Sequence, residues 1–352
     1  MCKVTIAIPV YNVEDYIEKS LLSALNQTFE DIEFLIIDDK STDTSMEIVQ
    51  RIRSTHPRGN SIRIIDHVVN KGLATVRNTA IDNASGEYLY FMDSDDIVAP
   101  ETISKLYDVI IRENADIVEG SYQVCSNRGD ILEKHIWSPI KVSGDFAICN
   151  WMKKCRIYYD GYAWNKLYNL RFLSLNNVRC IDSQRNEDVF FSFQVVIHAK
   201  SFVTISDITY NYLMRPGSIV NQGVDDIFYM HYLDIFIART NLIKGMNWVS
   251  PPNIIFNYYL QHFFEWWLRF VLYGNFTRQK KQFFYETLKE MYTLNFSTKD
   301  LIGLRYKIMY NLMKLSNYRY IRIFYSLDIL AAKCYNRLNR HFHIFKLPYS
   351  HL

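Results

Sequence analysis

Several common markers of function are missing from this chain of 352 residues. Its six cysteines are scattered and no Cys-x-x-Cys pair occurs, so neither a zinc ribbon nor a dithiol redox motif is indicated. No run of about 18 uninterrupted apolar residues is present, and the sequence therefore predicts no membrane-spanning helix. A strand-like run begins at Lys3 and leaves no room for a signal peptide, so we expect a cytoplasmic protein with reduced thiols.

A surplus of charge of one sign is missing as well. The formal net charge is +3, which argues against a general nucleic-acid binder, and no RNA-binding module is recognisable. The charge is unevenly placed, however, because residues 299–352 carry ten Lys or Arg against two acids. This basic segment is rich in aromatic residues and has helical apolar spacing, which is typical of a helix resting on an anionic membrane surface. We therefore expect peripheral contact with the inner membrane face through residues 300–352. The alternative is packing on the protein itself or on a second copy in a homo-oligomer.

The first half of the chain alternates short apolar runs with longer amphipathic ones. We expect strands at residues 4–10, 32–37, 62–69 and 87–92, and helices at residues 13–27, 43–53, 72–84 and 100–114. Asn12 is expected to cap the first helix. This alternation predicts an α/β fold with a Rossmann-like, mainly parallel sheet flanked by helices. Beyond residue 225 helical spacing and aromatic residues dominate, so we expect an α/β domain at residues 1–224 and a helical C-terminal region at residues 225–352.

The most informative stretch is residues 87–96, in which an apolar, aromatic run ends in Asp93, Asp95 and Asp96. Clustered like charge at a strand end is unfavourable unless a cation or a polar ligand shares the site. Mg²⁺ prefers hard oxygen ligands and is usually held by one or two carboxylates together with substrate phosphates. The other predicted strands also end in polar residues, and the carboxyl ends of parallel strands share one ligand-binding edge. The stretch therefore predicts a metal and ligand site, with a solvated acidic loop as the alternative.

Taken together, these stretches resemble the family 2 glycosyltransferases of the GT-A fold. The resemblance rests on Ile8-Pro9-Val10-Tyr11-Asn12, on the run from Leu35 to Asp43, on Asn70-Lys71-Gly72-Leu73-Ala74 with Arg77-Asn78, and on Asp93-Ser94-Asp95-Asp96. It continues more loosely through Trp164–Tyr168, Asn186–Asp188 and Tyr210–Ser218, and it covers about the first 220 residues. The chain departs from the family at Lys40, where Gly is common, so we expect a different turn or some strain there.

The resemblance implies a nucleotide-sugar site at the strand ends. Pro9, Tyr11 and Asn12 would line the base and the ribose. Asp39 would accept the imide N–H of uracil, which a carboxylate can do and which cytosine does not offer. Arg77 would contact the nucleotide or its phosphates. The structural alternatives are a turn or helix-terminal role for Asp39 and a surface position for Arg77.

The acidic cluster matches the Asp-x-Asp signature of this family. By resemblance, Asp95 would ligate Mn²⁺ or Mg²⁺, and Asp93 would contact the ribose, the donor sugar or the metal. Asp96 is left between a supporting contact and a helix N-terminal position. Arg215 would clamp the diphosphate, because a guanidinium suits phosphate oxygens, with an ordinary surface turn as the alternative.

The implied reaction is metal-dependent transfer of a hexosyl or N-acetylhexosaminyl group, with inversion, from a UDP-sugar or another nucleotide-sugar. The acceptor would be a saccharide or a lipid-linked molecule of cell-surface polysaccharide synthesis. Inversion in one displacement needs a base, and we expect Asp188 in that role, with Glu187 as the second candidate or an acceptor contact. An acid in the first turn of a helix is also what a capping role would place there. Trp164, Asn165 and Lys166 are expected to shape the sugar or acceptor pocket, with core packing as the alternative for Trp164.

Other functions fit the sequence less well. A sugar-nucleotide pyrophosphorylase would need a Gly-rich phosphate loop after the first strand, where this chain has Pro-Val-Tyr-Asn-Val. A haloacid-type phosphatase would need a nucleophilic Asp at the same place, and none occurs there. A catalytically inactive sugar-nucleotide-binding or assembly subunit would share most of the residues named above. It is therefore the alternative to the transferase.

Overall fold

The structure is a computed structural model that describes residues 2–155, 159, 161–181, 186–215, 226–246 and 277. The chain divides into two compact units, Met1–Arg239 and Thr240–Leu352, and most of the described residues belong to the first. The boundary predicted between residues 224 and 225 precedes helix α8 (Asp226–Gly245). The basic segment at residues 300–352, predicted to contact a membrane, lies outside the described residues. Among the helices that the structure describes, none combines the length and apolar character that crossing a bilayer requires.

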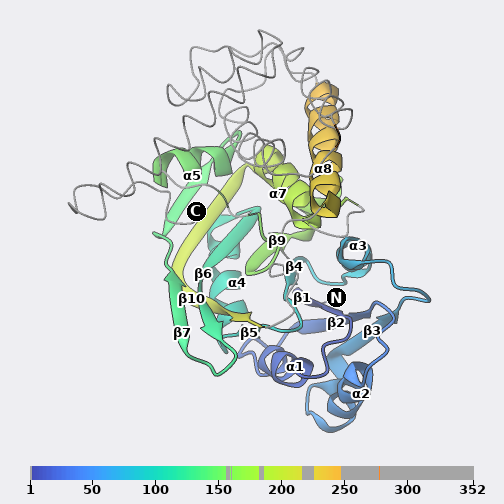
Figure 1. Cartoon of the computed structure of the whole chain (residues 1–352). Coiled ribbons are helices and arrows are strands. Elements are labelled where there is room, and N and C mark those ends of the chain that lie inside the picture. Colours follow the sequence, from blue (N-terminus) through green and yellow to red (C-terminus); the bar gives the residue numbers. More distant parts are fainter. Residues whose placement is uncertain are drawn as a thin grey trace, which may run out of the picture. The chain divides into compact units, whose positions relative to one another are not determined.

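A ten-stranded sheet organises the first unit, and its N-terminal part is parallel, as the alternating pattern predicts (Figure 1). It comprises β1 (Val4–Val10), β2 (Ile32–Asp38), β3 (Ile62–Asp66) and β4 (Tyr88–Phe91), in the spatial order β3-β2-β1-β4. The central strand β1 pairs on both sides, with Val4 opposite Ile32 and Tyr88. Strands that are covered on both faces read as continuous apolar runs, which is why β1 and β2 are recognisable in the sequence.

The second part of the sheet combines parallel and antiparallel strands, and the sequence did not predict how they pair. It contains β5 (Ile97–Val98), β6 (Ile117–Ser126), β7 (Ile131–His135), β8 (Ile140–Ser143), β9 (Lys166–Asn169) and β10 (Ser201–Met214). Strand β9 runs antiparallel between β4 and β6, and β10 runs parallel to β6. Strand β5, directly after the acidic cluster, pairs with β10 at Tyr210 and Asn211. This pairing brings the end of β10 to the acidic loop.

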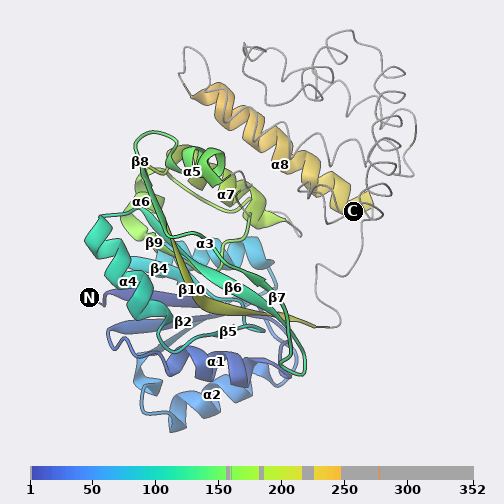
Figure 2. The same ribbon diagram turned by 90° about the vertical axis from the view of Figure 1, so that its left-hand side faces the viewer.

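Helices cover both faces of the sheet. They are α1 (Ile17–Leu25), α2 (Ser45–Thr55), α3 (Leu73–Asn83), α4 (Thr102–Glu113), α5 (Ala147–Cys155), α6 (Leu170–Leu175) and α7 (Glu187–His198), with the short 3₁₀ turn η1 (Gly59–Ser61). Figure 2 shows α1 and α2 on one side of β2 and α3 on the opposite side. Helix α1 buries Ile17, Leu21 and Ala24, whose spacing places them on one side of the helix.

One sequence prediction about this region is wrong. Asn12 does not cap the first helix, because α1 begins at Ile17 and its N-cap is Tyr16. The amide oxygen of Asn12 instead accepts the backbone N–H of Thr42 at 2.8 Å, and Asn12 has a φ of 51°. The side chain therefore joins the loop after β1 to the loop after β2, a tertiary contact that local pattern cannot distinguish from a cap.

Lys40 adopts the left-handed conformation, with a φ of 67°, so the departure from glycine noted in the sequence leaves this turn strained. We expect Lys40→Gly to raise the free energy of unfolding by up to about 1 kcal/mol, because glycine adopts this φ without a Cβ penalty. Urea unfolding followed by circular dichroism measures the difference. Lys71→Gly is the control: it is exposed and lacks a positive φ, so glycine should lower stability there. A loss of stability in both variants would contradict the expected strain at Lys40.

Candidate functional site

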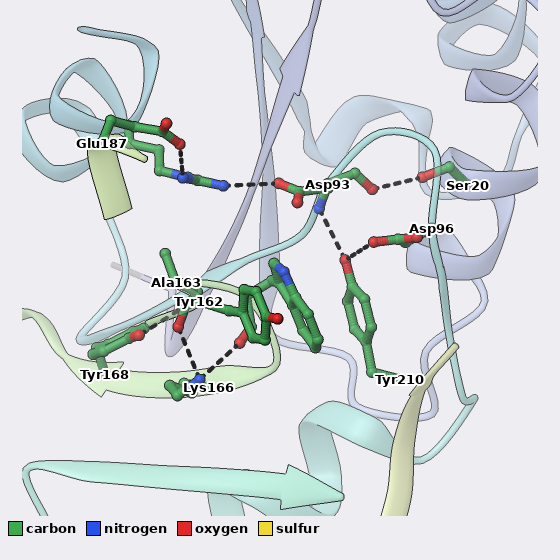
Figure 3. Close-up of polar contacts among 11 residues, drawn as sticks. Ser20, Asp93, Asp96, Tyr162, Ala163, Lys166, Tyr168, Glu187 and Tyr210 are labelled. Carbon is green, nitrogen blue, oxygen red and sulfur yellow. Dashed lines mark hydrogen bonds and ion pairs between the residues drawn. The ribbon is translucent and has the colours of Figure 1, made fainter. Parts of the chain in front are cut away.

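The acidic loop after β4 is fastened to strand β10. The backbone N–H of Asp93 donates to the hydroxyl of Tyr210 at 3.1 Å, and that hydroxyl donates to Asp96 Oδ2 at 2.7 Å (Figure 3). The second oxygen of Asp96 accepts the backbone N–H of Leu213 at 2.7 Å. On the other side of the loop, the Ser20 hydroxyl donates to the carbonyl of Asp93 at 3.4 Å. Asp96 therefore anchors the loop, and it is not a helix N-terminal residue because α4 begins only at Thr102.

Asp96 is an internal group. It is 1% exposed, and burial together with the neighbouring Asp95 and Asp93 raises its pKa well above the usual range of a carboxyl. Both oxygens of the Asp96 side chain are occupied by donors from β10. The role that the sequence left open is thus a supporting contact, which leaves the partly exposed Asp93 and Asp95 as the carboxylates available to a ligand.

Two guanidinium groups balance these two carboxylates. Arg77 Nη2 lies 3.1 Å from Asp93 Oδ1, and Arg215 forms an ion pair with Asp95. The side chains of Asp93 and Asp95 are 24% and 20% exposed. Burial raises the pKa of Asp93 while Arg77 opposes the rise and Asp95 adds to it. The guanidinium of Arg215 also lies over the ring of Tyr16, 5.1 Å from its centroid. Arg77 and Arg215 therefore offset the like charge that makes this strand end unusual.

Arg77 also reaches the helix that carries the predicted base. It projects from α3, is 3% exposed, and donates through Nη1 to Glu187 at the start of α7. Figure 3 shows Glu187 and Asp93 joined through this guanidinium. Arg77 therefore links α3, the acidic loop and α7 at one point. The nucleotide contact expected for Arg77 stays a prediction.

Asp188 lies in the first turn of α7, directly after Glu187. Burial and the negative charge of Glu187 raise the pKa of Asp188 to about 7, with Arg77 opposing the rise and Asp93 adding to it. A carboxyl whose pKa lies near the working pH can accept a proton from a substrate hydroxyl and release it afterwards. Strong perturbation of this kind is common at functional sites and also occurs in structural charge networks.

Asp39 lies at the neighbouring strand end and is 3% exposed. Its two oxygens accept the backbone N–H groups of Lys71 and Gly72 at 2.9 and 2.8 Å, and Oδ1 lies 2.7 Å from His67 Nδ1. His67 Nε2 in turn lies 3.0 Å from the Thr79 hydroxyl. Asp39 therefore holds the loop that ends at Gly72, whose φ of 82° favours glycine. The uracil contact stays a prediction, for which a carboxylate with about four acceptor positions has capacity left.

His67 was missed in the sequence, although it directly follows the third strand of the sheet. Its backbone N–H donates to the carbonyl of Asp38 at 2.9 Å, which continues the pairing between the ends of β2 and β3. Strand β3 itself ends at Asp66, three residues before the predicted end at Val69. The convergence of polar strand ends that the parallel sheet predicts is thus present at these two strands.

The residues expected to line the base lie at the end of β1. Pro9 is within the strand opposite Ile37, and Tyr11 follows it with 48% of its surface exposed. Asn12 is exposed too, apart from its bond to the loop after β2. An exposed aromatic ring beside a polar strand end suits stacking on a base, and this role stays a prediction for all three residues.

Trp164, Asn165 and Lys166 lie inside the protein, with exposures of 5%, 2% and 1%. Asn165 donates to the carbonyl of Gly120 at 2.7 Å, and Lys166 Nζ donates to the carbonyl of Tyr162 at 2.8 Å. The polar groups of Asn165 and Lys166 thus bind the backbone of neighbouring segments. Their expected part in a sugar or acceptor pocket stays a prediction. Because both side chains are buried, they would influence such a pocket by holding the backbone segments to which they are bonded.

The two partly exposed carboxylates, Asp93 and Asp95, fit a divalent metal ion. Asp93 and Asp95 offer hard oxygen donors, and Asp95 already neighbours a cationic group, Arg215. Within the part of the chain that the structure describes, no cluster of three or more His, Cys, Asp or Glu side chains could enclose a metal. Two carboxylates suit Mn²⁺ or Mg²⁺ whose remaining ligands would be phosphate oxygens and water, and Arg215 would then have to leave Asp95.

Asp188 gives the protein a measurable dependence of stability on pH. Its folded-state pKa of about 7 lies above the value of about 3.9 expected when unfolded, so it stabilises the fold at low pH and this contribution is lost as pH rises through 7. We expect the free energy of unfolding of Asp188→Asn, relative to that of wild type, to be roughly 1–3 kcal/mol higher at about pH 8 than at about pH 5. Urea unfolding at both pH values measures this gain.

The control for this measurement is Asp108→Asn, a change at an exposed carboxyl of α4. Its stability relative to wild type should be the same at both pH values. An Asp188→Asn difference that is equally independent of pH would show that the Asp188 carboxyl titrates in its ordinary range.

Comparison with known proteins places this chain among glycosyltransferases in sequence. The model of glycosyl transferase family 2 matches residues 5–175. The chain is 29% identical over 256 residues to the glycosyltransferase GlyA of Streptococcus pneumoniae, a match that covers 70% of this chain and 35% of GlyA. It is 30% identical over 217 residues to the poly(ribitol-phosphate) beta-glucosyltransferase of Bacillus spizizenii, covering 60% of this chain and 32% of that enzyme. The chain thus spans about a third of the length of these two relatives.

Solved structures share the fold. The crystal structure of S. aureus TarS 1–349 in complex with UDP-GlcNAc superposes with a TM-score of 0.72 at 19% identity, covering 93% of this chain and 92% of that one. The mannosyltransferase PcManGT from Pyrobaculum calidifontis, in complex with GDP-Man and Mn²⁺, gives a TM-score of 0.51 at 13% identity, covering 84% and 76%. The predicted α/β fold is confirmed, and through residues 5–175 the chain belongs to glycosyl transferase family 2, with the GT-A fold.

Proposed function

We propose that this chain is an inverting, metal-dependent glycosyltransferase that moves a hexosyl or N-acetylhexosaminyl group from a UDP-sugar to a saccharide or lipid-linked acceptor. The observation that carries the proposal is the pair of ion pairs that Arg77 makes with Asp93 and Glu187. They join the Asp-x-Asp loop to the helix of the predicted base. The UDP-GlcNAc bound by TarS and the polymer named for the Bacillus spizizenii relative support this choice of donor and acceptor classes.

In this proposal Asp188 takes the proton of the acceptor hydroxyl. Its raised pKa, about 7, makes it an adequate base near neutral pH while still allowing it to release the proton. Glu187 is held by Arg77, so it is less free to act as the base and instead keeps Asp188 in place at the helix start. Asp39 would accept the uracil N–H, and the exposed ring of Tyr11 would cover the base.

The leaving diphosphate needs positive charge near Asp93 and Asp95. A bound Mn²⁺ or Mg²⁺ would supply Lewis-acid neutralisation of the diphosphate. Arg215 would exchange its ion pair with Asp95 for phosphate oxygens, which a guanidinium binds in a bidentate manner. Asp93, held by Arg77, would stay in position while this exchange takes place.

The proposal is tested by release of nucleotide from a panel of UDP-, CDP- and GDP-sugars with saccharide acceptors, with Mn²⁺ and with EDTA. We expect metal-dependent release of UDP in preference to CDP, because Asp39 finds no N–H to accept at that ring position of cytosine. Asp188→Asn should lower kcat about 10²- to 10⁴-fold while UDP binding is retained. Asp108→Asn, on the exposed face of α4, is the control and should be active.

The outcomes separate the alternatives. Nucleotide binding without transfer to any acceptor would favour an inactive sugar-nucleotide-binding or assembly subunit. Full transfer by Asp188→Asn would move the base role to Glu187 and leave the metal site intact. Activity in EDTA equal to that in Mn²⁺ would remove the metal from the proposal.

We also propose that residues 300–352 hold the protein at an anionic membrane surface, where a lipid-linked acceptor would lie; ten basic residues against two acids after residue 298 support this. Arg319→Gln with Arg322→Gln should weaken binding to vesicles of phosphatidylglycerol and phosphatidylcholine roughly 10- to 30-fold, since each basic residue contributes about 1 kcal/mol. Flotation measures the bound fraction. Arg51→Gln with Arg53→Gln, exposed on α2, is the control. Equal flotation of the two double variants would contradict the proposal.

A further inference from the structure

A second buried arginine contacts the helix of the predicted base. Arg239, from α8, donates through Nη2 to the carbonyl of Val189 at 2.6 Å. Its guanidinium lies over the ring of Phe193, 4.9 Å from the ring centroid. Val189 and Phe193 lie about one turn apart in α7, so they are neighbours on the same side of that helix. Arg239 therefore contacts the first two turns of α7 together.

Asp188 lies in the sequence between two residues that are each bonded to a buried arginine. Arg77, from α3, binds the side chain of Glu187, the residue before Asp188. Figure 3 shows this link at Glu187. Arg239, from α8, binds the backbone of Val189, the residue after Asp188. Both arginines are 3% exposed. The first turn of α7 is thus held by side chains from two other helices, one on each side of Asp188 in the sequence.

The charge of Arg239 is poorly compensated for so deeply buried a group. Within the described residues its contacts are a carbonyl and an aromatic ring rather than a carboxylate, and its buried Nε has no hydrogen-bond partner. A buried cation without a carboxylate partner is costly, and the first turns of a helix are an unfavourable place for positive charge. An apolar side chain of similar length should therefore give equal or greater stability at this position. Stability alone does not account for an arginine here.

What an arginine supplies, and an apolar side chain does not, is a bond of fixed direction. The guanidinium is planar and its N–H groups form a rigid fork. The ring of Phe193 lies against this plane, and the Val189 carbonyl accepts from one arm of the fork. The bond therefore fixes the backbone of the residue that directly follows Asp188. A shift of this turn would move the Asp188 carboxyl with it.

We propose that Arg239 is a positioning residue for Asp188: by binding the Val189 carbonyl it fixes the first turn of α7, and with it the place at which the Asp188 carboxyl meets the acceptor hydroxyl. The catalytic part of this inference rests on the proposed function, whereas the hold on the helix does not. The residues of α8 up to Arg239 fall within the first compact unit. On this inference they serve the same reaction as α7, although the sequence placed them in a separate C-terminal region.

The test compares Arg239→Leu with wild type in the full chain, without a ligand and during turnover. We expect hydrogen exchange, followed by mass spectrometry, to be about 5- to 10-fold faster in the peptide that covers the start of α7 and unchanged in β1. The urea midpoint of unfolding should equal or exceed that of wild type. With the most active donor and acceptor of the panel above, kcat should fall about 10- to 10²-fold, since a misplacement of about 1 Å can have this effect. The KM for the UDP-sugar should change less than about 3-fold, because the first turn of α7 is not part of the proposed uracil contact.

Two further variants complete the test. Arg239→Lys keeps the charge and a donor but loses the rigid fork, so its kcat should lie between those of wild type and Arg239→Leu. Asp234→Leu, at an exposed position of α8, is the control and should leave both the exchange of α7 and kcat unchanged.

Unchanged exchange at the start of α7 in Arg239→Leu would overturn the inference, and so would wild-type kcat in this variant. A lowered urea midpoint, or faster exchange throughout the first unit, would show that Arg239 supports the fold as a whole and would overturn it too. The outcome for the proposed function is separate. If the wild-type protein transfers no sugar from any donor, the transferase proposal fails, and faster exchange confined to the start of α7 still supports the hold of Arg239 on this helix.

Discussion

The buried guanidinium of Arg77 is the constraint on which the site depends. It lies between Asp93, in the loop after β4, and Glu187, at the start of α7, two carboxylates that would repel each other without it. A buried ion pair contributes little net stability but is costly to break, because one partner then remains charged and uncompensated. Arg77 therefore fixes geometry: it sets the distance between the Asp-x-Asp loop and the start of α7, and Asp188 takes its environment from both.

The aspartates at the strand ends divide into two groups. Asp39 and Asp96 turn inward and accept several hydrogen bonds from the backbone and side chains of neighbouring loops. Asp93 and Asp95 are partly exposed and pair with the guanidinium groups of Arg77 and Arg215. The inward acids hold the loops so that the partly exposed acids have fixed positions, which a site for a charged ligand requires. Sequence motifs record both groups in the same stretches and do not separate them.

Local pattern was enough for the parallel part of the fold. The bounds of β1 were predicted to the residue, because an apolar, β-branched run between polar residues has few alternatives. The first helix was predicted four residues too early, since the turn at Val13 continues the apolar spacing without being helical. Strands β9 and β10 pair with segments far along the chain, and nothing local marks that pairing. For the same reason the sequence placed Arg77 near a ligand and missed its acidic partners, and it placed Lys166 in a pocket and missed its ion pair with Glu119.

The link between Arg77 and Glu187 joins residues 110 positions apart. Closing so long a loop has an entropic cost that must be met before the contact is gained, and contacts of this kind slow folding. The βαβ units at the N-terminal end can form from neighbouring segments, but the charges around Asp93 are balanced only when α7 has docked. A nascent chain that has left the ribosome only as far as α4 therefore carries an acidic loop without its completing helix. The order of synthesis thus separates the formation of the sheet from the completion of the site.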